Sequence, residues 1–300
     1  PYIKCLLDFI DTDQLEPMKI VVNPGNGGAG QVLDQLSEHL PFEFIKVHFE
    51  PDATFPNGVP NPMIEENRKS TSEAVKKHNA DLGIAWDGDF DRCFFFDEKG
   101  EFIEGYYVVG LLAENFLKKS ESEKIIYDPR LIWNTIDTVT KAGGLAIQSQ
   151  SGHSFIKQCM RENNAIYGGE MSAHHYFRDF YYCDSGMIPW LVVAELISSS
   201  GRKLSTMLDI CKANYPVSGE INSTVNDVSI TISKIRSQYE NNALSIDEMD
   251  GVSMEFSDWR FNVRASNTEP LLRLNVESRN NHVLMQEKTK ELLEIINCES

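Results

Sequence analysis

Two kinds of apolar pattern alternate along the first two thirds of the chain. Short apolar runs rich in valine and isoleucine, typical of buried strands, alternate with stretches in which apolar residues recur every three or four positions, as in a helix. The expected strands are residues 19–22, 43–47, 82–86, 93–96, 124–127, 145–148 and 165–167. Strands that alternate with helices pair in parallel through crossover connections, so this part of the chain is predicted to be α/β.

The last third has another pattern. Strand-like runs at 219–225, 252–256, 259–263 and 271–276 lie between helical patterns at 228–238 and 283–296. This arrangement indicates a small α+β domain. A further break is expected near residues 101–105, before a helical pattern at 106–118. We therefore predict three domains, at residues 1–103, 104–212 and 213–300.

The two remaining segments of note are the start of the chain and a proline-rich stretch. Pro1 is not a methionine, and residues 2–10 already form an amphipathic helical pattern, so the chain is expected to begin inside a larger protein. Residues 52–65 contain several prolines and are expected to form a loop.

Composition and charge narrow the class of protein. The 300 residues are 41% hydrophobic and carry a formal net charge of −17. Such a charge repels polyanions, which disfavours nucleic acid and anionic membranes as partners, and any phosphate site must be a local basic pocket. No apolar run approaches the roughly 20 residues that span a bilayer, and no signal peptide opens the chain. The six scattered cysteines contain no CxxC pair, so we expect reduced thiols and a cytoplasmic protein.

The sharpest local signal is the sequence DGDFDR at residues 87–92. Asp87, Asp89 and Asp91 follow the apolar run 82–86, and three carboxylates on one turn can converge on a hard cation. A calcium-binding EF-hand loop begins similarly, and Glu98 stands at its twelfth position. However, Arg92 occupies the position where that loop needs glycine, and strands flank the motif. The motif therefore favours a metal site of another kind over an acidic surface turn.

A second constellation is the sequence RASNTEP at residues 264–270, followed by Arg273. Two guanidinium groups, two hydroxyls and an amide side chain suit the terminal oxygens of a phosphate, and the planar fork of arginine binds phosphate bidentately. Taken alone, the motif fits a polar turn with surface arginines equally well.

A third motif is GGEMSAHH at residues 168–175. Glu170 and Ser172 could hold adjacent sugar hydroxyls, because a carboxylate accepts hydrogen bonds and a hydroxyl both donates and accepts. His174 or His175 could be a zinc ligand, but the sequence offers no second cluster to partner either one. A structural histidine is the preferred interpretation.

Two further segments lie where α/β sheets collect anions. The sequence SGHS at residues 151–154 opens a helical pattern that includes Lys157, and Asp128-Pro129-Arg130 follows an expected strand. Strand ends and helix N-termini are common anion sites. A helix cap supplied by Ser151 is the simpler explanation for the first segment, and no GxSxG elbow supports a hydrolase triad.

One motif favours a rival function. Residues 25–30 satisfy GxGxxG after the expected strand 19–22, and Glu50 lies at the distance a dinucleotide-binding fingerprint requires. Pro24 before the first glycine and the proline-rich loop after the second strand count against a dinucleotide-dependent oxidoreductase. Glycines needed only for a tight turn explain the match as well.

Taken in order, DGDFDR, SGHSFIK, GEMSAHHYF and RASNTEP resemble the signature loops of the α-D-phosphohexomutase superfamily, and the match is most similar to its bacterial phosphomannomutases. The resemblance covers nearly the whole chain. It implies two α/β domains with mixed sheets and a small α+β C-terminal domain, which correspond to the second, third and fourth of the family's four domains. It also implies an isomerase that interconverts mannose 6-phosphate and mannose 1-phosphate.

The resemblance implies a role for each motif. Asp87, Asp89 and Asp91 would bind Mg²⁺, and Arg92, His153 and Arg130 would act near the reacting group. Glu170 and Ser172 would bind sugar hydroxyls O3 and O4, with His174 beside them. The non-transferred phosphate would be held by Arg264, Ser266, Asn267, Thr268 and Arg273. Phe90 replaces a glycine common in relatives, Ser151 stands where threonine is usual, and Arg130 stands where many relatives have lysine.

One family feature has no counterpart in these residues. The family's phosphorylated serine lies on a first-domain loop of the type TASHNP, and no such sequence occurs here. The resemblance implies that this first domain of the same polypeptide is the partner of the chain and that hexose 1,6-bisphosphate is the intermediate. The chain alone is then expected to bind sugar phosphates without turning them over. A glucose-specific mutase, or a sugar-phosphate sensor that never had a first domain, remains open.

Overall fold

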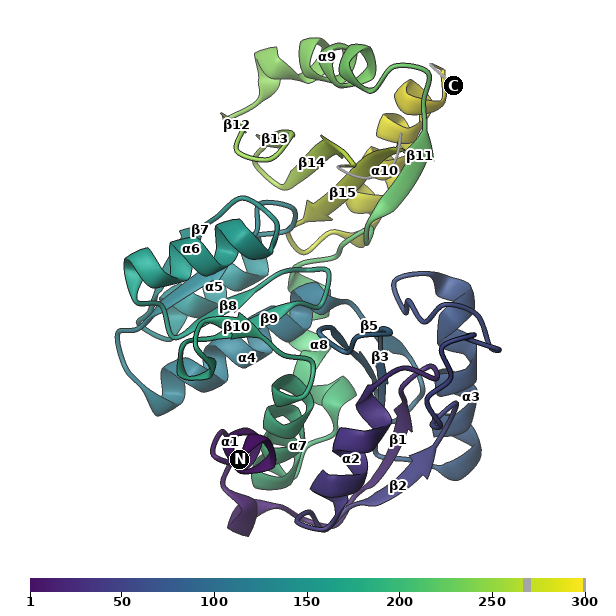
Figure 1. Cartoon of the computed structure of the whole chain (residues 1–300). Coiled ribbons are helices and arrows are strands. Elements are labelled where there is room, and N and C mark those ends of the chain that lie inside the picture. The colour runs from purple at the N-terminus through teal and green to yellow at the C-terminus, as the bar shows by residue number, and fades with distance from the viewer. Residues whose placement is uncertain (267–270, 299–300) are drawn as a thin grey trace.

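The computed structural model describes residues 1–266 and 271–298, which form three five-stranded sheets in succession along the chain (Figure 1). The third sheet and its helices form the upper part of the view, and the first two sheets lie below it. This arrangement confirms the predicted succession of two α/β units and a small α+β unit.

The first sheet has the order β2-β1-β3-β4-β5, and its first three strands are parallel while β4 and β5 are antiparallel. Its strands are β1 (Lys19–Asn23), β2 (Glu43–Lys46), β3 (Leu82–Trp86), β4 (Cys93–Phe96) and β5 (Phe102–Ile103). Its helices are α1 (Tyr2–Leu7), η1 (Thr12–Gln14), α2 (Ala29–Ser37), η2 (Glu65–Arg68) and α3 (Lys69–His78). The predicted helix over 2–10 therefore ends early, at Leu7, and the proline-rich loop is confirmed up to Ile64.

The second sheet repeats this mixed plan with the order β10-β9-β8-β6-β7, in which β6, β7 and β8 are parallel. Its strands are β6 (Lys124–Tyr127), β7 (Leu145–Gln148), β8 (Tyr167–Gly169), β9 (His175–Phe177) and β10 (Cys183–Asp184). The accompanying helices are α4 (Gly105–Lys119), α5 (Trp133–Lys141), α6 (His153–Asn163), η3 (Arg178–Phe180), α7 (Ile188–Ser200) and α8 (Leu204–Asn214). The strand predicted at 165–167 begins two residues later than expected.

The third sheet is antiparallel throughout, with the order β11-β15-β14-β13-β12. Its strands are β11 (Ile221–Thr224), β12 (Ser245–Asp247), β13 (Val252–Glu255), β14 (Trp259–Ala265) and β15 (Leu271–Ser278). Its helices are α9 (Val228–Tyr239), η4 (Glu240–Asn242) and α10 (His282–Asn297).

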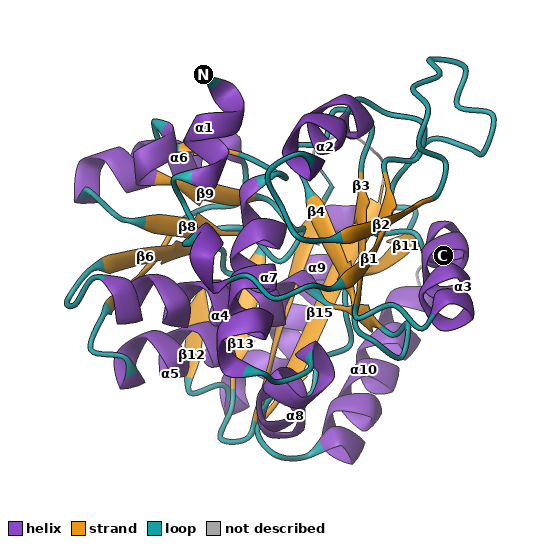
Figure 2. Ribbon diagram, turned by 90° about the horizontal axis from the view of Figure 1, so that it is seen from below, coloured by secondary structure: helices purple, strands orange, loops and turns teal. Residues whose placement is uncertain are grey.

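The first two sheets share one hydrophobic core, whereas the third has its own. Buried side chains of β3, β4, α4 and α7 belong to a single cluster that includes Trp86, Leu112 and Trp190. Helix α7 is apolar on nearly every side, which is the pattern of a helix buried between two layers. In Figure 2 it lies between α4 and the strands of the first sheet. Phe261 and Leu292 belong to the separate cluster of the third unit.

Glu277 on β15 joins the third unit to the second. Its carboxylate is fully buried and accepts hydrogen bonds from the Tyr106 hydroxyl at 2.5 Å, the Ile132 amide at 2.7 Å and Arg260 Nη1 at 2.8 Å. The bonds from Tyr106 and Ile132 cross between the two units, so a change in their arrangement would leave a buried carboxylate without donors. No helix of residues 1–266 and 271–298 has the length and apolar character needed to cross a membrane.

Candidate active site

The motif residues follow the carboxyl ends of parallel strands. Strand β3 leads into residues 87–92, β6 into 128–130, β7 into 149–153 and β8 into 170–174. Loops at these ends meet at one edge of their sheets, where α/β proteins bind ligands. The fold therefore brings together segments far apart in sequence.

The acidic loop, residues 87–92, turns between antiparallel strands β3 and β4. One oxygen from each of Asp87, Asp89 and Asp91 lies within 4.8 Å of the others, so the predicted convergence of the three carboxylates is confirmed. An all-oxygen donor set suits Mg²⁺. Phe90 at the tip of the loop has a φ of 51°, in the left-handed region. Glycine adopts this conformation without strain, so a glycine also fits this position.

Arginine and burial set the charge of this loop. Asp87 is 4% exposed, and Arg92 Nε donates to its Oδ2 at 2.6 Å. Burial raises the pKa of Asp87 to about 6, although Arg92 opposes the rise. Burial also opposes ionisation of Asp91, but the hydrogen bond and charge of His174 outweigh it and hold the pKa below the usual range. A cation bound to the loop would stabilise the charged form of both groups.

The glycine turn supports the acidic loop from behind. The Gly28 amide donates to the Gly88 carbonyl oxygen at 3.2 Å. A Cβ on Gly27 would lie 2.5 Å from that oxygen, and a Cβ on Gly28 would lie 2.8 Å from the Phe90 ring. These glycines permit close approach of two backbones, which accounts for the GxGxxG match without a dinucleotide.

Backbone contacts join the acidic loop to residues 168–175. Arg92 and His174 form an antiparallel bridge, and the Cys93 amide donates to the Ala173 carbonyl. The Trp86 indole N–H adds a bond to the Gly186 carbonyl at 2.8 Å. The predicted cation loop and the predicted sugar loop therefore form one continuous surface.

Arg130 lies at the centre of this surface and is 2% exposed. It forms an ion pair with Asp128, and its Nη2 lies 3.4 Å from Glu170 Oε1 and 3.2 Å from Ser172 Oγ. Glu170 is held further by the Gly152 amide at 2.9 Å and the Tyr176 hydroxyl at 2.6 Å. Burial opposes ionisation of Glu170, yet Arg130 and these donors hold its pKa below the usual range. The Glu170 carboxylate is thus ionised, and its hydrogen bonds fix its orientation.

The predicted phosphate-binding residues, Arg264, Ser266 and Arg273, surround a carboxylate that lies outside the motif at residues 264–270. We call this group of residues the phosphate cradle. Arg264 and Arg273 are register partners on β14 and β15. Glu220 lies between them and Arg130, with an oxygen 3.5 Å from a guanidinium nitrogen of each of the three arginines. The Ser266 hydroxyl is 3.3 Å from Arg273 Nη2. Three guanidinium groups around one anion form the local basic pocket that an acidic protein needs to bind phosphate.

The two motif histidines face each other. His153 Nε2 lies 3.1 Å from His174 Nε2, and the side chains form a cluster with Asp91 and Asp184. The interpretation of a structural histidine is correct for His175, which is fully buried against the Tyr167 hydroxyl at 2.7 Å. His174 lies instead in a cluster with His153, Asp91 and Asp184, which the sequence does not display, so its role stays a prediction.

Other predictions met different outcomes. Ser151 does not cap α6, because Gly152 takes the cap position and the buried Ser151 hydroxyl has no hydrogen-bond partner among the described residues. Asn267 and Thr268 lie outside the described residues. Glu220 and Asp184 belong to the site but were not predicted from the sequence. Each is a single acidic residue in a short segment, and no neighbouring residues form a motif with it.

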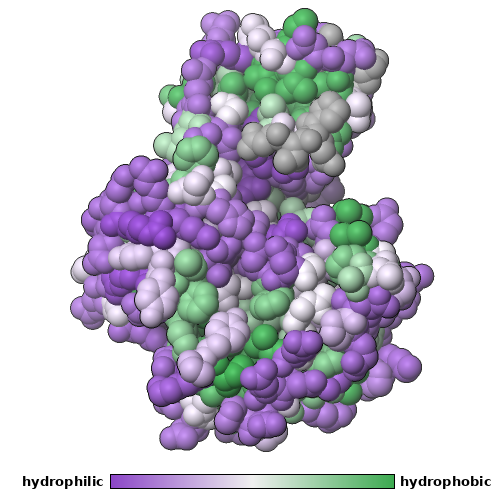
Figure 3. Space-filling view, in the orientation of Figure 1, coloured by the Kyte–Doolittle hydropathy of each residue, from purple (hydrophilic) through white to green (hydrophobic). Residues whose placement is uncertain are grey.

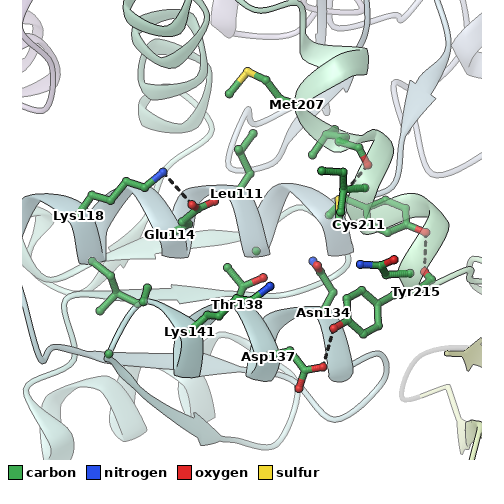
Figure 4. Close-up of a pocket in the computed structure, with 18 of the residues that line it drawn as sticks. Leu111, Glu114, Lys118, Asn134, Asp137, Thr138, Lys141, Met207, Cys211 and Tyr215 are labelled. Atoms are coloured by element: carbon green, nitrogen blue, oxygen red, sulfur yellow. Dashed lines mark hydrogen bonds and ion pairs between the residues drawn. The ribbon is translucent and has the colours of Figure 1, made fainter. Parts of the chain in front are cut away.

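In Figure 3 hydrophilic residues gather along the middle of the visible face, where the upper unit meets the lower two. A pocket of about 710 Å³ lies elsewhere, between α4, α5 and α8 (Figure 4). In its lining Glu114 forms an ion pair with Lys118 and Asp137 accepts a hydrogen bond from Tyr215, and no residue of the four motifs lies there.

Comparison with known proteins gives a consistent result. Family models of phosphoglucomutase/phosphomannomutase match residues 1–100 (alpha/beta/alpha domain II), 104–214 (alpha/beta/alpha domain III) and 220–294 (C-terminal domain). The chain is 55% identical over 295 residues to the phosphohexose mutases of Xanthomonas campestris and 55% identical over 301 residues to the phosphomannomutase of Escherichia coli K12.

These alignments cover 98% and 99% of this chain but 66% of either relative, so the chain spans slightly less than two thirds of their length. Among solved structures, a phosphoglucomutase/phosphomannomutase family protein from Burkholderia thailandensis superimposes with a TM-score of 0.85 at 28% identity. That superposition covers 99% of this chain and 64% of the other. Sequence and fold thus agree on the same set of relatives.

Proposed function

The chain belongs to the phosphoglucomutase/phosphomannomutase family, and from this premise we propose that it forms the metal-binding, sugar-binding and phosphate-binding part of a phosphomannomutase. The complete enzyme would be an isomerase that interconverts mannose 6-phosphate and mannose 1-phosphate. The catalytic phosphoserine would come from a domain outside these 300 residues. We assign residues 1–103, 104–212 and 213–300 to the three domains of this part and place the enzyme in the cytoplasm.

The observation that carries this proposal is the two-ended charge pattern of the site. The carboxylates of Asp87, Asp89 and Asp91 lie at one end, and Arg264 and Arg273 lie at the other, linked through Arg130 and Glu170. A sugar with phosphate groups at both ends needs a cation for the reacting phosphoryl group and arginines for the distant one.

Each end has a separate task in the proposed reaction. Arg264 and Arg273, with Ser266, Asn267 and Thr268, hold the phosphate that is not transferred. Glu170 and Ser172, with His174 beside them, orient the sugar through its hydroxyls. Precise placement of the reacting oxygen lowers the barrier, because the entropy of alignment is lost on binding and not during the chemical step.

Mg²⁺ held by the acidic loop would neutralise charge that develops on the transferred phosphoryl group. Arg92 belongs to this loop and would contact the same oxygens. His153 would assist proton transfer at the reacting sugar hydroxyl, and Arg130 would donate a hydrogen bond to it.

A reaction in two halves requires the sugar phosphate to bind in either orientation. The phosphoserine would transfer its phosphoryl group to the free hydroxyl of the monophosphate, giving hexose 1,6-bisphosphate. The resulting serine would then take the phosphoryl group from the other end of the sugar. The arginine cluster grips a phosphate through its terminal oxygens, which are the same at either end of the sugar. One cradle can therefore serve both half-reactions.

Titration calorimetry with mannose 6-phosphate in the presence of Mg²⁺ tests the proposal. We expect saturable binding that weakens at least about 30-fold, or about 2 kcal/mol, in Arg264→Ala, because a charge-assisted hydrogen bond contributes about that much. Arg236→Ala removes the same charge from the exposed helix α9 and should bind normally.

Two companion titrations separate the alternatives. Glucose 6-phosphate binding equal to or tighter than mannose 6-phosphate would favour a glucose-specific mutase. NAD binding without any response to sugar phosphate would overturn the family function. A coupled assay should detect no turnover by the 300-residue chain, and appreciable mutase activity would contradict an external phosphoserine.

A further inference from the structure

The geometry points to a second metal site in this surface, one that takes a borderline cation: we infer that His153, His174 and Asp91 form a binding site for Zn²⁺. The inference needs only these three side chains and does not depend on the sugar substrate. It is separate from the all-oxygen Mg²⁺ site, although Asp91 belongs to both.

Three potential ligand atoms converge on one point. His153 Nε2 and His174 Nε2 are 3.1 Å apart, and Asp91 Oδ2 lies 3.9 Å from the first and 3.6 Å from the second. The point equidistant from three atoms at these separations lies about 2.1 Å from each, which is the usual length of Zn–N and Zn–O bonds. The side chains would need little movement to bind an ion there.

The other ring nitrogens are held in the manner of zinc-binding histidines. A metal-bound imidazole almost always donates its second N–H to a carboxylate, carbonyl or other acceptor, which fixes the ring and raises its basicity. His153 Nδ1 lies 2.8 Å from Asp184 Oδ2, and His174 Nδ1 lies 3.3 Å from Ser172 Oγ and 3.7 Å from Glu170 Oε2. The Nε2 atoms of both histidines therefore remain on the side of Asp91.

Asp184 is a positioning residue in this arrangement and not a ligand. Its Oδ2 is engaged with His153 Nδ1, and its Oδ1 pairs with Lys157 Nζ at 2.7 Å. A carboxylate whose two oxygens already have partners fixes the imidazole ring and is less available to the ion. The lysine also compensates the charge of Asp184, so the net charge offered to the ion comes from Asp91.

The donor set decides which cation is preferred. Two imidazole nitrogens and one carboxylate are borderline ligands that suit Zn²⁺, whereas Mg²⁺ prefers oxygen throughout. The site is also accessible, since the side chain of His153 is 44% exposed and that of Asp91 is 28% exposed. Three protein ligands with one open side is the arrangement of zinc sites that keep a water molecule.

Calorimetric titration of the whole chain with ZnCl₂ is the primary test, with a Co²⁺ absorption spectrum as a second readout. We expect one equivalent of Zn²⁺ to bind and tetrahedral Co²⁺ to give visible d–d bands. His153→Ala and His174→Ala should each weaken Zn²⁺ binding at least about 100-fold. Asp184→Asn should weaken it by about 10- to 100-fold, as expected for an outer hydrogen-bond partner.

Three control variants identify the ligands. Asp89→Asn removes a proposed Mg²⁺ ligand and one negative charge near Asp91, so it should weaken Zn²⁺ binding by about tenfold at most, less than either histidine variant. His78→Ala, at the end of α3, and Cys183→Ser, beside Asp184, should leave Zn²⁺ affinity unchanged. Circular dichroism of each variant checks that the fold is retained.

Two results would overturn the inference. Zn²⁺ affinity that is the same in the folded His153→Ala and His174→Ala variants would place the ion elsewhere, and affinity of the parent chain weaker than about 1 mM would mean that the cluster does not bind zinc. Either result, obtained while Mg²⁺-dependent sugar-phosphate binding persists, leaves the proposed function intact.

Discussion

Glu220 shows how a single side chain can set the charge of a binding pocket. Its carboxylate is mostly buried and lies within 3.5 Å of guanidinium nitrogens from Arg130, Arg264 and Arg273. Burial opposes its ionisation, but the three arginines hold its pKa below the usual range. An incoming phosphate therefore meets a cluster whose positive charge is already partly compensated.

Glu220→Gln is expected to tighten binding of mannose 6-phosphate by about tenfold. Removing one negative charge a few ångströms from the phosphate is favourable by about 1 kcal/mol or more at the effective dielectric of a protein surface. The same change should lower the free energy of unfolding by about 1–3 kcal/mol, because three arginines lose a carboxylate that they share. Calorimetric titration and thermal unfolding measure the two effects.

Glu248→Gln is the matched control, since Glu248 pairs with Arg236 on the exposed surface. Weaker or unchanged phosphate binding in Glu220→Gln would show that the carboxylate acts mainly as a scaffold for the arginines. Tighter binding in both variants would point to a general charge effect of the acidic protein.

At the scale of elements, the glycine turn between β1 and α2 acts as a support for the acidic loop. The turn packs backbone against backbone, with no room for a side chain at Gly27. The carboxylates proposed to bind Mg²⁺ therefore depend on a segment about 60 residues earlier in the chain, whose own sequence resembles a dinucleotide-binding motif.

Gly27→Ala is expected to weaken Mg²⁺ binding by about tenfold without preventing folding. The added methyl group must displace the Gly88 carbonyl, and Asp87 and Asp89 flank that peptide. Isothermal titration with MgCl₂ measures the change. Gly58→Ala strains a glycine of positive φ where a Cβ meets no atom within 4 Å, so it should cost stability alone. Equal Mg²⁺ affinity in Gly27→Ala and the parent would mean that the acidic loop adapts freely.

At the scale of the whole molecule, the division of cores predicts how the chain unfolds. The first two sheets share a core that contains Leu112, and the third has a separate core around Phe261. Buried contacts of Glu277 connect the two parts, but the connection is mainly polar. Units with separate apolar cores unfold with limited cooperativity.

Scanning calorimetry is expected to resolve two transitions. Phe261→Ala should destabilise the C-terminal unit by about 3–5 kcal/mol and shift mainly one transition. Leu112→Ala, with a cost of about 2–5 kcal/mol, should shift mainly the other. A single transition that moves equally in both variants would instead show that the contact through Glu277 makes the three sheets one cooperative unit.

Most of the helices and strands could be predicted from the sequence, and so could the motifs whose side chains are close along the chain. Short apolar runs identified the strands β1, β3, β6 and β14, and period-3.6 patterns identified helices between them, because both patterns reflect which residues are buried. The acidic loop and the arginine motif could be predicted because their donors lie within a few residues of each other.

How these motifs combine depends on the way the sheets pack. The pairing of His153 with His174, the position of Glu220 among three arginines and the support of the acidic loop by the glycine turn all join residues distant in sequence. Such contacts leave no periodic pattern in the sequence, because each one forms between loops that follow different strands. The physical reason is general: local pattern records burial, whereas the charge and reach of a site are set by side chains that meet only after the sheets have packed.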